Sequence, residues 1–229
     1  MGRIRPSDQK RCEMLTKVEL HRQVTRARLA TAARVPLAEG GGVTASLIAD
    51  LSRQVGVHPH SFRTLFPTDD DLFDAVNDEL VAQCEARLRA GIARFALTEA
   101  ARRCPQVALE EAAVAIAESW PIDRGGILIR AERRARVLRA STDGQAVVAA
   151  ERRFVGALVE VMTDLMGHLG RRFTWSPTLA VRVILDTFER SFETWLLSGH
   201  EEADFSTSPY ARRTLPTLFG QLSEPHLFG

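Results

Sequence analysis

Apolar residues recur every three or four positions from residue 72 to residue 95, and this spacing limits the folds open to the chain. With 3.6 residues per turn, these apolar residues form one continuous stripe along a helix of roughly 26 residues. Thr68 is a suitable N-cap, and Asp69, Asp70 and Asp71 follow it in the first turn, where acidic side chains favour the helix dipole. The pattern predicts a long amphipathic helix whose apolar face carries Leu72, Phe73, Val76, Leu80, Cys84, Leu88, Ile92 and Phe95.

Helical periodicity continues through most of the chain. We expect a first helix at about 16–38, with a kink or an early end at Pro36, because proline removes an N–H and crowds the preceding turn. Two short helices are expected at about 46–54 and 59–65. The later helical patterns lie at about 107–119, 126–140, 144–170, 177–198 and 209–222. No strand pattern is convincing, so the expected fold class is all-α.

The composition excludes several classes of protein. With 229 residues, 45% of them hydrophobic and 26% charged, the chain can build a packed core. No apolar run approaches the roughly 20 residues that a membrane span needs, and the N-terminal residues lack the apolar centre of a secretory signal. Cys12, Cys84 and Cys104 form no C-x-x-C motif. They fit a reducing cytoplasm as inert thiols, with redox sensing by one of them as the alternative. We expect a cytoplasmic protein without cofactor or bound metal.

Charge is distributed unevenly along the chain. Residues 1–66 contain eleven Lys and Arg against five Asp and Glu, a balance of +6. Residues 67–229 contain 19 Lys and Arg against 24 Asp and Glu, a balance of −5. A basic first third on an acidic body suggests that the first third faces a polyanion such as nucleic acid. The alternative is a surface that is uneven by chance.

The two short helices and the glycine between them have the spacing of a helix-turn-helix. Small Ser52 allows close approach of the helices, Gly56 makes the turn four residues later, and Val57 and Phe62 fill the small core. The second helix can then enter a DNA major groove, which is about 12 Å wide. The side chains expected to face outward are His58, Pro59, His60, Ser61 and Thr64.

The sequence His58-Pro59-His60 raises a metal site as an alternative to DNA contact. The two histidines are two residues apart at a helix start, so they do not share a helix face. No cluster of Cys or His lies near them in the sequence to complete a set of four ligands. Contact with DNA bases or phosphates is therefore the preferred interpretation.

The run IADLSRQVGVHPHSFRTLFPTDDDLFDAV, from Ile48 to Val76, resembles the DNA-binding signature of the TetR/AcrR family of bacterial repressors. The motif-bearing resemblance covers about residues 20–80. The matching residues are Leu51-Ser52, Gly56-Val57, Phe62, Phe66 and the step from Phe66-Pro67-Thr68 to Leu72-Phe73. The rest of the chain is similar to the family in the number and order of its helices.

Several positions depart from the family pattern. Arg63 replaces the usual phosphate-contacting tyrosine and still offers donors to a phosphate. Asp69 replaces a common lysine at the start of the fourth helix and would repel a phosphate. His60 takes the place of a small residue, and His58 takes that of a Ser/Thr cap. These changes indicate an unusual operator preference.

The resemblance implies a three-helix DNA-binding domain at residues 1–67, joined by a long fourth helix to a larger helical ligand-binding and dimerisation domain at 68–229. It implies a repressor that binds a palindromic operator in double-stranded DNA, forms a homodimer through its last two helices, and is released by a small-molecule effector. The expected DNA-contacting residues are Thr44, Ser46, His58, Pro59, His60, Ser61, Arg63, Thr64 and Thr68. The expected ligand-contacting residues are Phe95, Trp120, Ile127, Met162, Met166 and Phe188. The expected dimer face carries Leu179, Val183, Leu185, Phe188, Phe192, Trp195, Leu196, Leu215, Leu218, Phe219 and Leu222.

Two other classes of function compete with this interpretation. One is an all-helical enzyme, but the chain has no nucleophile elbow, P-loop, H-E-x-x-H motif or dinucleotide fingerprint, and we identify no catalytic residue. The other is a helical adaptor that binds protein and no longer binds DNA specifically. The departures at Asp69 and Pro59 favour that second alternative.

Overall fold

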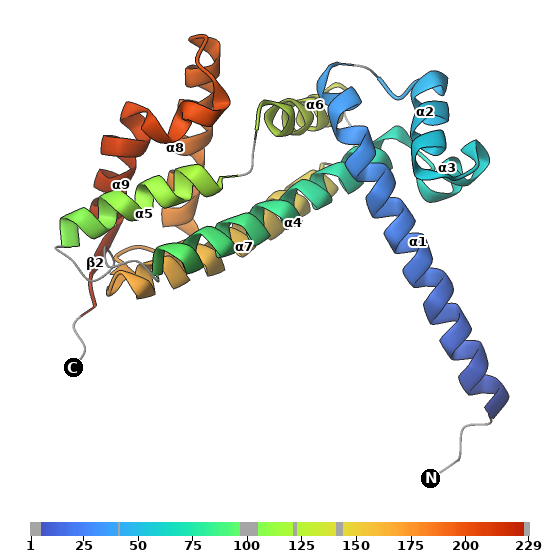
Figure 1. Ribbon diagram of the computed structural model, residues 1–229, viewed down its shortest axis with the longest axis horizontal. Coiled ribbons are helices and arrows are strands. Elements are labelled where there is room, and N and C mark those ends of the chain that lie inside the picture. Colours follow the sequence, from blue (N-terminus) through green and yellow to red (C-terminus); the bar gives the residue numbers. More distant parts are fainter. Residues whose placement is uncertain (1–5, 41, 97–104, 121–122, 141–143, 227–229) are drawn as a thin grey trace. The chain divides into compact units, whose positions relative to one another are not determined.

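The computed structural model describes residues 6–40, 42–96, 105–120, 123–140 and 144–226, which are almost entirely helical (Figure 1). Contacts between residues divide the chain into two compact units. The first unit runs to Glu79 and includes Leu128–Arg133, and the second contains Leu80–Ile127 and the chain from Arg134 onward. This division falls within the long fourth helix, whereas the resemblance implies a domain boundary before that helix.

The first unit contains α1 (Pro6–Ala38), α2 (Ala45–Val55), α3 (Pro59–Leu65) and the beginning of α4 (Asp69–Ala96). These bounds agree with the predicted helices, except that α1 begins ten residues earlier than expected. The α1 helix also continues through Pro36 and ends at Ala38. Because the proline lies in the last turn, only two helical residues follow it.

Apolar side chains from all four helices form the core of the first unit. Leu29 and Ala33 of α1, four residues apart and so on one helix face, are completely buried. Phe62 of α3 and Phe66 just beyond it are also completely buried, with ring centroids 5.2 Å apart and planes tilted by 49°. Aromatic pairs in such tilted arrangements add to the stability that burial alone provides.

The second unit contains the later predicted helices, and also two short strands, a 3-10 helix and a π-helical turn that the sequence pattern does not reveal. Its named elements are α5 (Pro105–Ser119), α7 (Gln145–His168), β1 (Arg171–Phe173), α8 (Pro177–Leu197), the 3-10 helix η2 (Glu202–Thr207), the π-helical turn η3 (Tyr210–Thr214), α9 (Leu215–Leu222) and β2 (Ser223–Pro225). Helix α6 (Arg124–Ala140) contributes residues to both units. The expectation of no strands is wrong, because β1 pairs antiparallel with β2, with Phe173 opposite Ser223. The helix predicted at 209–222 is a π-helical turn followed by α9.

Helices of the second unit pack around one apolar cluster. Helix α5 lies against α9, and α7 lies against α8 (Figure 1). The second half of α4 lies beside α7, where Arg89 forms ion pairs with Glu160 at 3.0 Å and Asp164 at 3.4 Å. None of the described helices combines the length and apolarity needed to cross a lipid bilayer.

Helices α4 and α5 approach very closely at Gly91. A β-carbon built at this glycine would lie 1.9 Å from Ser119 Oγ and 2.6 Å from Ser119 Cβ. Both distances are far below van der Waals contact. The contact between the two helices therefore depends on the missing side chain at position 91.

We predict that the phenol of Tyr210, the chain's only tyrosine, ionises at a higher pH than the phenol of an exposed tyrosine. Burial raises the pKa of its phenol to about 12, against the opposing effect of a hydrogen bond of 3.0 Å to Thr187 Oγ1. In an unfolded chain the pKa is about 10. The folded state should therefore lose stability as the pH rises from about 10 towards 12. Tyrosinate absorbance measured against pH checks this, with the denatured chain as control. A folded-state midpoint near that of the denatured chain would contradict the prediction.

We also predict that Ser52→Ala stabilises the first unit. Ser52 is 1% exposed, and its Oγ has no hydrogen-bond partner among the described residues. Alanine removes this unsatisfied hydroxyl and has a higher helix propensity, so the free energy of unfolding should rise by about 1 kcal/mol. Denaturant unfolding measures the change. Ser61→Ala, at an exposed position of α3, is the matched control. A lower midpoint for Ser52→Ala would refute the argument.

Candidate nucleic-acid interface

The backbone between α2 and α3 has the geometry that the glycine spacing predicts. Gly56 follows α2 in the left-handed conformation, with φ 78° and ψ 35°. The backbone N–H groups of Gly56 and Val57 both donate to the carbonyl of Ser52 at 2.9 Å. Residues with a β-carbon adopt this conformation at a cost. Gly56 therefore fixes the point where the chain reverses direction, and the predicted turn is confirmed.

Helix α3 has one buried and one exposed face. Phe62 and Leu65 point into the core of the first unit. The exposed side chains are those of Pro59, His60, Ser61, Arg63 and Thr64. An outward face of this kind on the second helix of a helix-turn-helix is the surface that reads base edges in known complexes.

The remaining predicted DNA-contacting residues are exposed at helix starts close to α3 in sequence. Thr44 caps α2, because its hydroxyl accepts a hydrogen bond from the Leu47 N–H at 3.1 Å, and its Oγ1 lies 2.8 Å from Ser46 Oγ. Thr68 caps α4 by accepting from the Asp71 N–H at 3.2 Å. All nine predicted residues are thus solvent-exposed. Their contact with DNA stays a prediction.

His58 caps α3. Its backbone is extended, and its Nδ1 accepts a hydrogen bond from the His60 N–H at 3.1 Å. This is the role of the Ser/Thr cap that it replaces in the resemblance. In the part of the chain that the structure describes, no three His, Cys, Asp or Glu side chains gather in a way that could hold a metal ion. His58 and Pro59 thus occupy the N-cap and first position of α3, and DNA contact by His58 and His60 stays a prediction.

The start of α4 is closed by its own side chains. The Thr68 hydroxyl and the Thr68 N–H donate to the Asp71 carboxylate at 2.7 and 2.8 Å. The hydroxyl hydrogen bond, followed by that of the backbone N–H, lowers the pKa of the Asp71 carboxyl below its usual value. This reciprocal arrangement is a capping box with aspartate in the place of glutamate.

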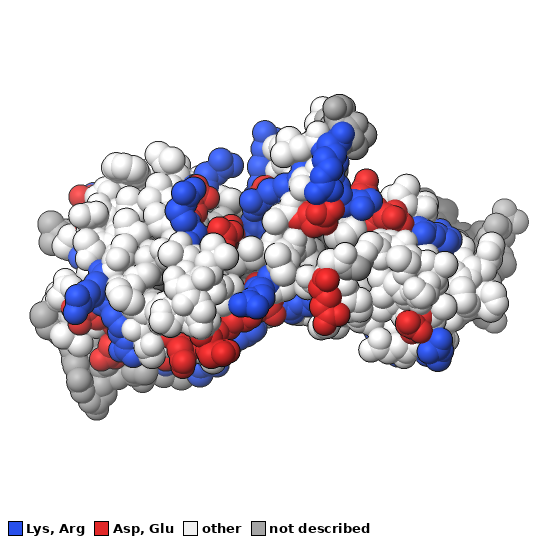
Figure 2. All heavy atoms as spheres, turned by 90° about the horizontal axis from the view of Figure 1, so that it is seen from above, with Lys and Arg blue, Asp and Glu red and all other residues white. Residues whose placement is uncertain are grey.

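Two exposed arginines of the first unit form ion pairs with acidic side chains of the protein. Arg53 pairs with Asp50 at 3.0 Å, and Arg63 pairs with Asp69 at 3.1 Å. Figure 2 shows a face of the molecule on which Lys and Arg are interspersed with Asp and Glu. The balance of +6 describes residues 1–66 only. The first unit also contains six acidic residues at 67–79, and two Arg against one Glu at 128–133, so its own formal balance is +1.

Arg26 is an important residue that sequence reasoning missed. Its Nη1 donates to the Leu65 carbonyl at 2.6 Å and its Nη2 donates to the Asp71 carbonyl at 3.2 Å. The guanidinium carbon also lies 4.7 Å from the centroid of the Phe66 ring. Its partners are 39 to 45 residues away in the chain, so no local pattern distinguishes Arg26 from a surface arginine.

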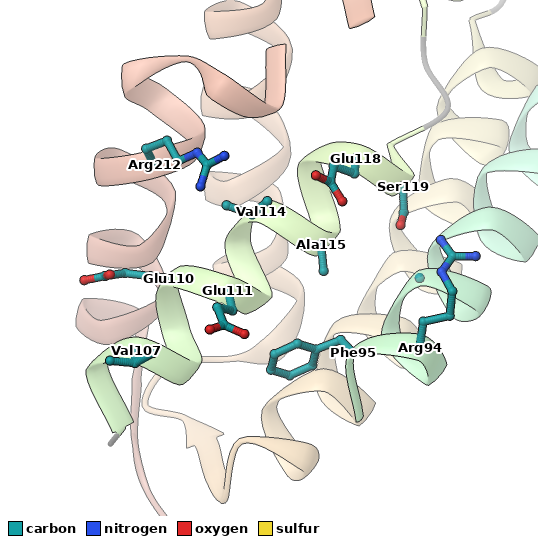
Figure 3. A pocket seen from close by; sticks show the side chains of 11 residues that line it. Arg94, Phe95, Val107, Glu110, Glu111, Val114, Ala115, Glu118, Ser119 and Arg212 are labelled. Carbon is teal, nitrogen blue, oxygen red and sulfur yellow. The ribbon is translucent and has the colours of Figure 1, made fainter. Parts of the chain in front are cut away.

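The predicted ligand-contacting residues separate into different places in the second unit. Phe95 borders a cavity of about 430 Å³ that lies along α5, with Arg94, Glu118 and Ser119 also on its walls (Figure 3). Trp120 and Phe188 border a second cavity of about 370 Å³, and their stacked rings have centroids 4.1 Å apart. Ile127, Met162 and Met166 line neither of these two cavities.

Trp120, which lines the second cavity, has a polar N–H group that is buried and without a partner among the described residues. The residue as a whole is 9% exposed. Acidic side chains at Glu118, Asp123 and Glu202 and the cation Arg87 also line this cavity. A ligand role for any of these residues stays a prediction.

The predicted dimer face is largely used inside the chain itself. Six of its residues are buried in the core of the second unit: Leu185, Phe188, Phe192, Leu215, Phe219 and Leu222. Val183, Trp195, Leu196 and Leu218 are partly buried against the same core. Leu179 of α8 is 50% exposed, and so are Trp175 at 55% and Leu197 at 89%. The apolar surface that α8 leaves outside the core therefore consists of Leu179, Leu197 and the partly buried Val183, Trp195 and Leu196.

We predict that His58 stabilises the first unit as a cap. His58→Ala should lower the free energy of unfolding by about 1 kcal/mol, because the His60 N–H loses its acceptor. His58→Ser should restore most of this stability. His21→Ala, at an exposed histidine of α1, serves as the control. Thermal unfolding followed by circular dichroism measures all three. Equal stability of the alanine and serine variants would count against the capping role.

A comparison with solved structures agrees with this fold. No protein-family model and no curated protein matches the sequence. Among solved structures, the chain is similar to the crystal structure of a candidate TetR-family transcriptional regulator from Mesorhizobium loti MAFF303099. The TM-score is 0.62 at 13% sequence identity, and the similarity covers 88% of this chain and 96% of the other. The chain therefore has the all-α fold of a TetR-family regulator, as the resemblance of its helix-turn-helix sequence implies.

Proposed function

We propose that the protein is a dimeric, sequence-specific DNA-binding transcriptional regulator of the TetR/AcrR type. The observation that carries this proposal is the outward face of α3. It presents His60, Ser61 and Thr64 to solvent, on a helix held from behind by buried Phe62 and Leu65. The fold shared with the regulator from Mesorhizobium loti supports the same proposal.

The exposed residues divide into two roles. Pro59, His60 and Ser61 occupy the first turn of α3, the part of a recognition helix that approaches base edges. Histidine and serine side chains offer both donors and acceptors to bases. Thr44, Ser46, Arg63 and Thr68 are exposed outside that first turn and would contact phosphates, which position the protein without reading sequence.

The proposal includes a homodimer and a palindromic operator. Two recognition helices read half-sites one helical turn apart when they lie about 34–36 Å from each other. A seven-residue recognition helix contacts only a few base pairs, so one protomer alone would select a short sequence. Leu179 and Leu197 of α8, which are exposed, and Val183, Trp195 and Leu196, which are partly buried, are the apolar residues proposed for the dimer contact.

The proposal also includes a small-molecule effector that releases the repressor from DNA in the cytoplasm. The cavities bordered by Phe95 and by Trp120 and Phe188 are the sites proposed for it. Effector and DNA would each favour a different arrangement of the dimer. Thermodynamic linkage then requires that DNA weakens effector binding by the same factor as effector weakens DNA binding.

Selection from a random duplex DNA library tests the proposal. At about 150 mM salt, where purely electrostatic binding is weakened, we expect enrichment of a palindrome. His60→Ala should change the preferred base at the same position of both half-sites, at a cost of about 1–3 kcal/mol for the original base. His168→Ala, at an exposed histidine of α7, should leave the preference unchanged. A folded protein that enriches no sequence would favour the helical adaptor instead.

A further inference from the structure

The ion pair between Arg63 and Asp69 joins two adjoining elements of the candidate interface. Arg63 lies in the last turn of α3, and Asp69 is the first residue of α4. Arg63 Nη1 lies 3.1 Å from Asp69 Oδ1, and the two side chains are 42% and 34% exposed. The pair is thus at the surface, where a DNA backbone would have access to it.

The neighbouring side chains account for which carboxylate pairs with Arg63. The guanidinium carbon of Arg63 lies 5.9 Å from the centroid of the Phe62 ring, which is itself completely buried. Asp71, two residues beyond Asp69, accepts two hydrogen bonds from Thr68. Asp71 is therefore committed to its cap, and Asp69 is the carboxylate that reaches Arg63.

A carboxylate and a phosphate compete for the same guanidinium donors. Both accept charge-assisted hydrogen bonds from arginine in similar planar geometry. Arg63 donates to Asp69 through Nη1, so a phosphate that takes Arg63 in a two-donor contact including Nη1 must share or displace the carboxylate. The Asp69 carboxylate also repels the incoming phosphate. Both effects lower the affinity of Arg63 for DNA.

We propose that Asp69 is an internal competitor of the DNA phosphate at Arg63 and so sets how strongly the protein binds duplex DNA of any sequence. The proposal rests on the proposed DNA-binding function. Since phosphate contacts carry no sequence information, weakening one leaves selection to the base contacts made by α3. Asp69 thereby reduces retention of the protein on DNA that lacks its operator.

Two charge-matched variants test this proposal on random-sequence duplex DNA. Asp69→Asn removes the partner of Arg63, whereas Asp70→Asn removes the same charge one residue further along α4. An exposed ion pair contributes a factor of about two to five in each protomer, so Asp69→Asn should tighten binding about fivefold or more. It should also steepen the dependence of log affinity on log salt by about 0.9 for each phosphate gained. Asp70→Asn should change affinity by about twofold or less, without that change in slope.

A double-mutant cycle then isolates the pair. In the Arg63→Ala background, Asp69→Asn should give only the small gain seen with Asp70→Asn. Melting temperatures of all variants confirm that each protein is folded. Equal effects of Asp69→Asn and Asp70→Asn would overturn the proposal, and so would an undiminished gain from Asp69→Asn without Arg63.

These outcomes are distinct from failure of the proposed function. If the wild-type chain enriches a palindrome but the two asparagine variants behave alike, only the competition is wrong. If no sequence is enriched and Asp69→Asn still tightens random-duplex binding through Arg63, the competition stands and sequence-specific regulation fails. If none of the folded proteins binds any duplex at low salt, both proposals fail.

Discussion

The structure of the first unit depends on one guanidinium group. Arg26 of α1 donates to the carbonyl of Leu65, at the end of α3, and to the carbonyl of Asp71, in the first turn of α4. Its planar fork of donors can satisfy two carbonyls at once, and its face can lie over the Phe66 ring at the same time. Because α3 is only seven residues long, it has little internal stability of its own. Its orientation is therefore determined by this contact and by the burial of Phe62 and Leu65.

The electrostatics of the first unit differ from what residues 1–66 alone indicate, because the acidic residues at 67–79 reduce the formal balance of the whole unit to +1. Arginines in this unit serve three internal purposes: Arg26 binds carbonyl groups, Arg53 pairs along α2, and Arg63 pairs across the step from α3 to α4. Exposed pairs of this kind contribute little to stability. They nevertheless reduce the field that a polyanion experiences. In the proposed function, hydrogen bonding by neutral side chains on α3 would then account for a larger share of recognition.

Much of the fold is predictable from the sequence because its determinants are local. The apolar stripe from Leu72 to Phe95 predicts α4, and Gly56 predicts the turn between α2 and α3, since both signals lie within the element concerned. The strands β1 and β2 are not predictable in this way. Each has three residues, and Phe173 pairs with Ser223, which is 50 residues away.

In the candidate site too, the features set by local sequence are predictable and those set by contacts between separate helices are not. Exposure of His60 and Ser61 follows from the helical period once α3 is located. The contacts of Arg26 and the pairing of Arg63 with Asp69 depend on how separate helices meet, so the sequence alone predicts only that these residues are charged. The role of the apolar residues of α8 is not predictable for the same reason. Their period predicts one buried face but does not distinguish the chain's own core, where Phe188 and Phe192 lie, from a subunit contact.

The close approach of α4 and α5 has a consequence for how the sequence can change over evolution. A β-carbon at position 91 would lie 2.6 Å from Ser119 Cβ, so even alanine at position 119 would leave the overlap. Any residue other than glycine at position 91 therefore requires either glycine at position 119 or a shift of one helix. Positions 91 and 119 should covary among homologues of this chain, with a glycine retained in at least one of the two.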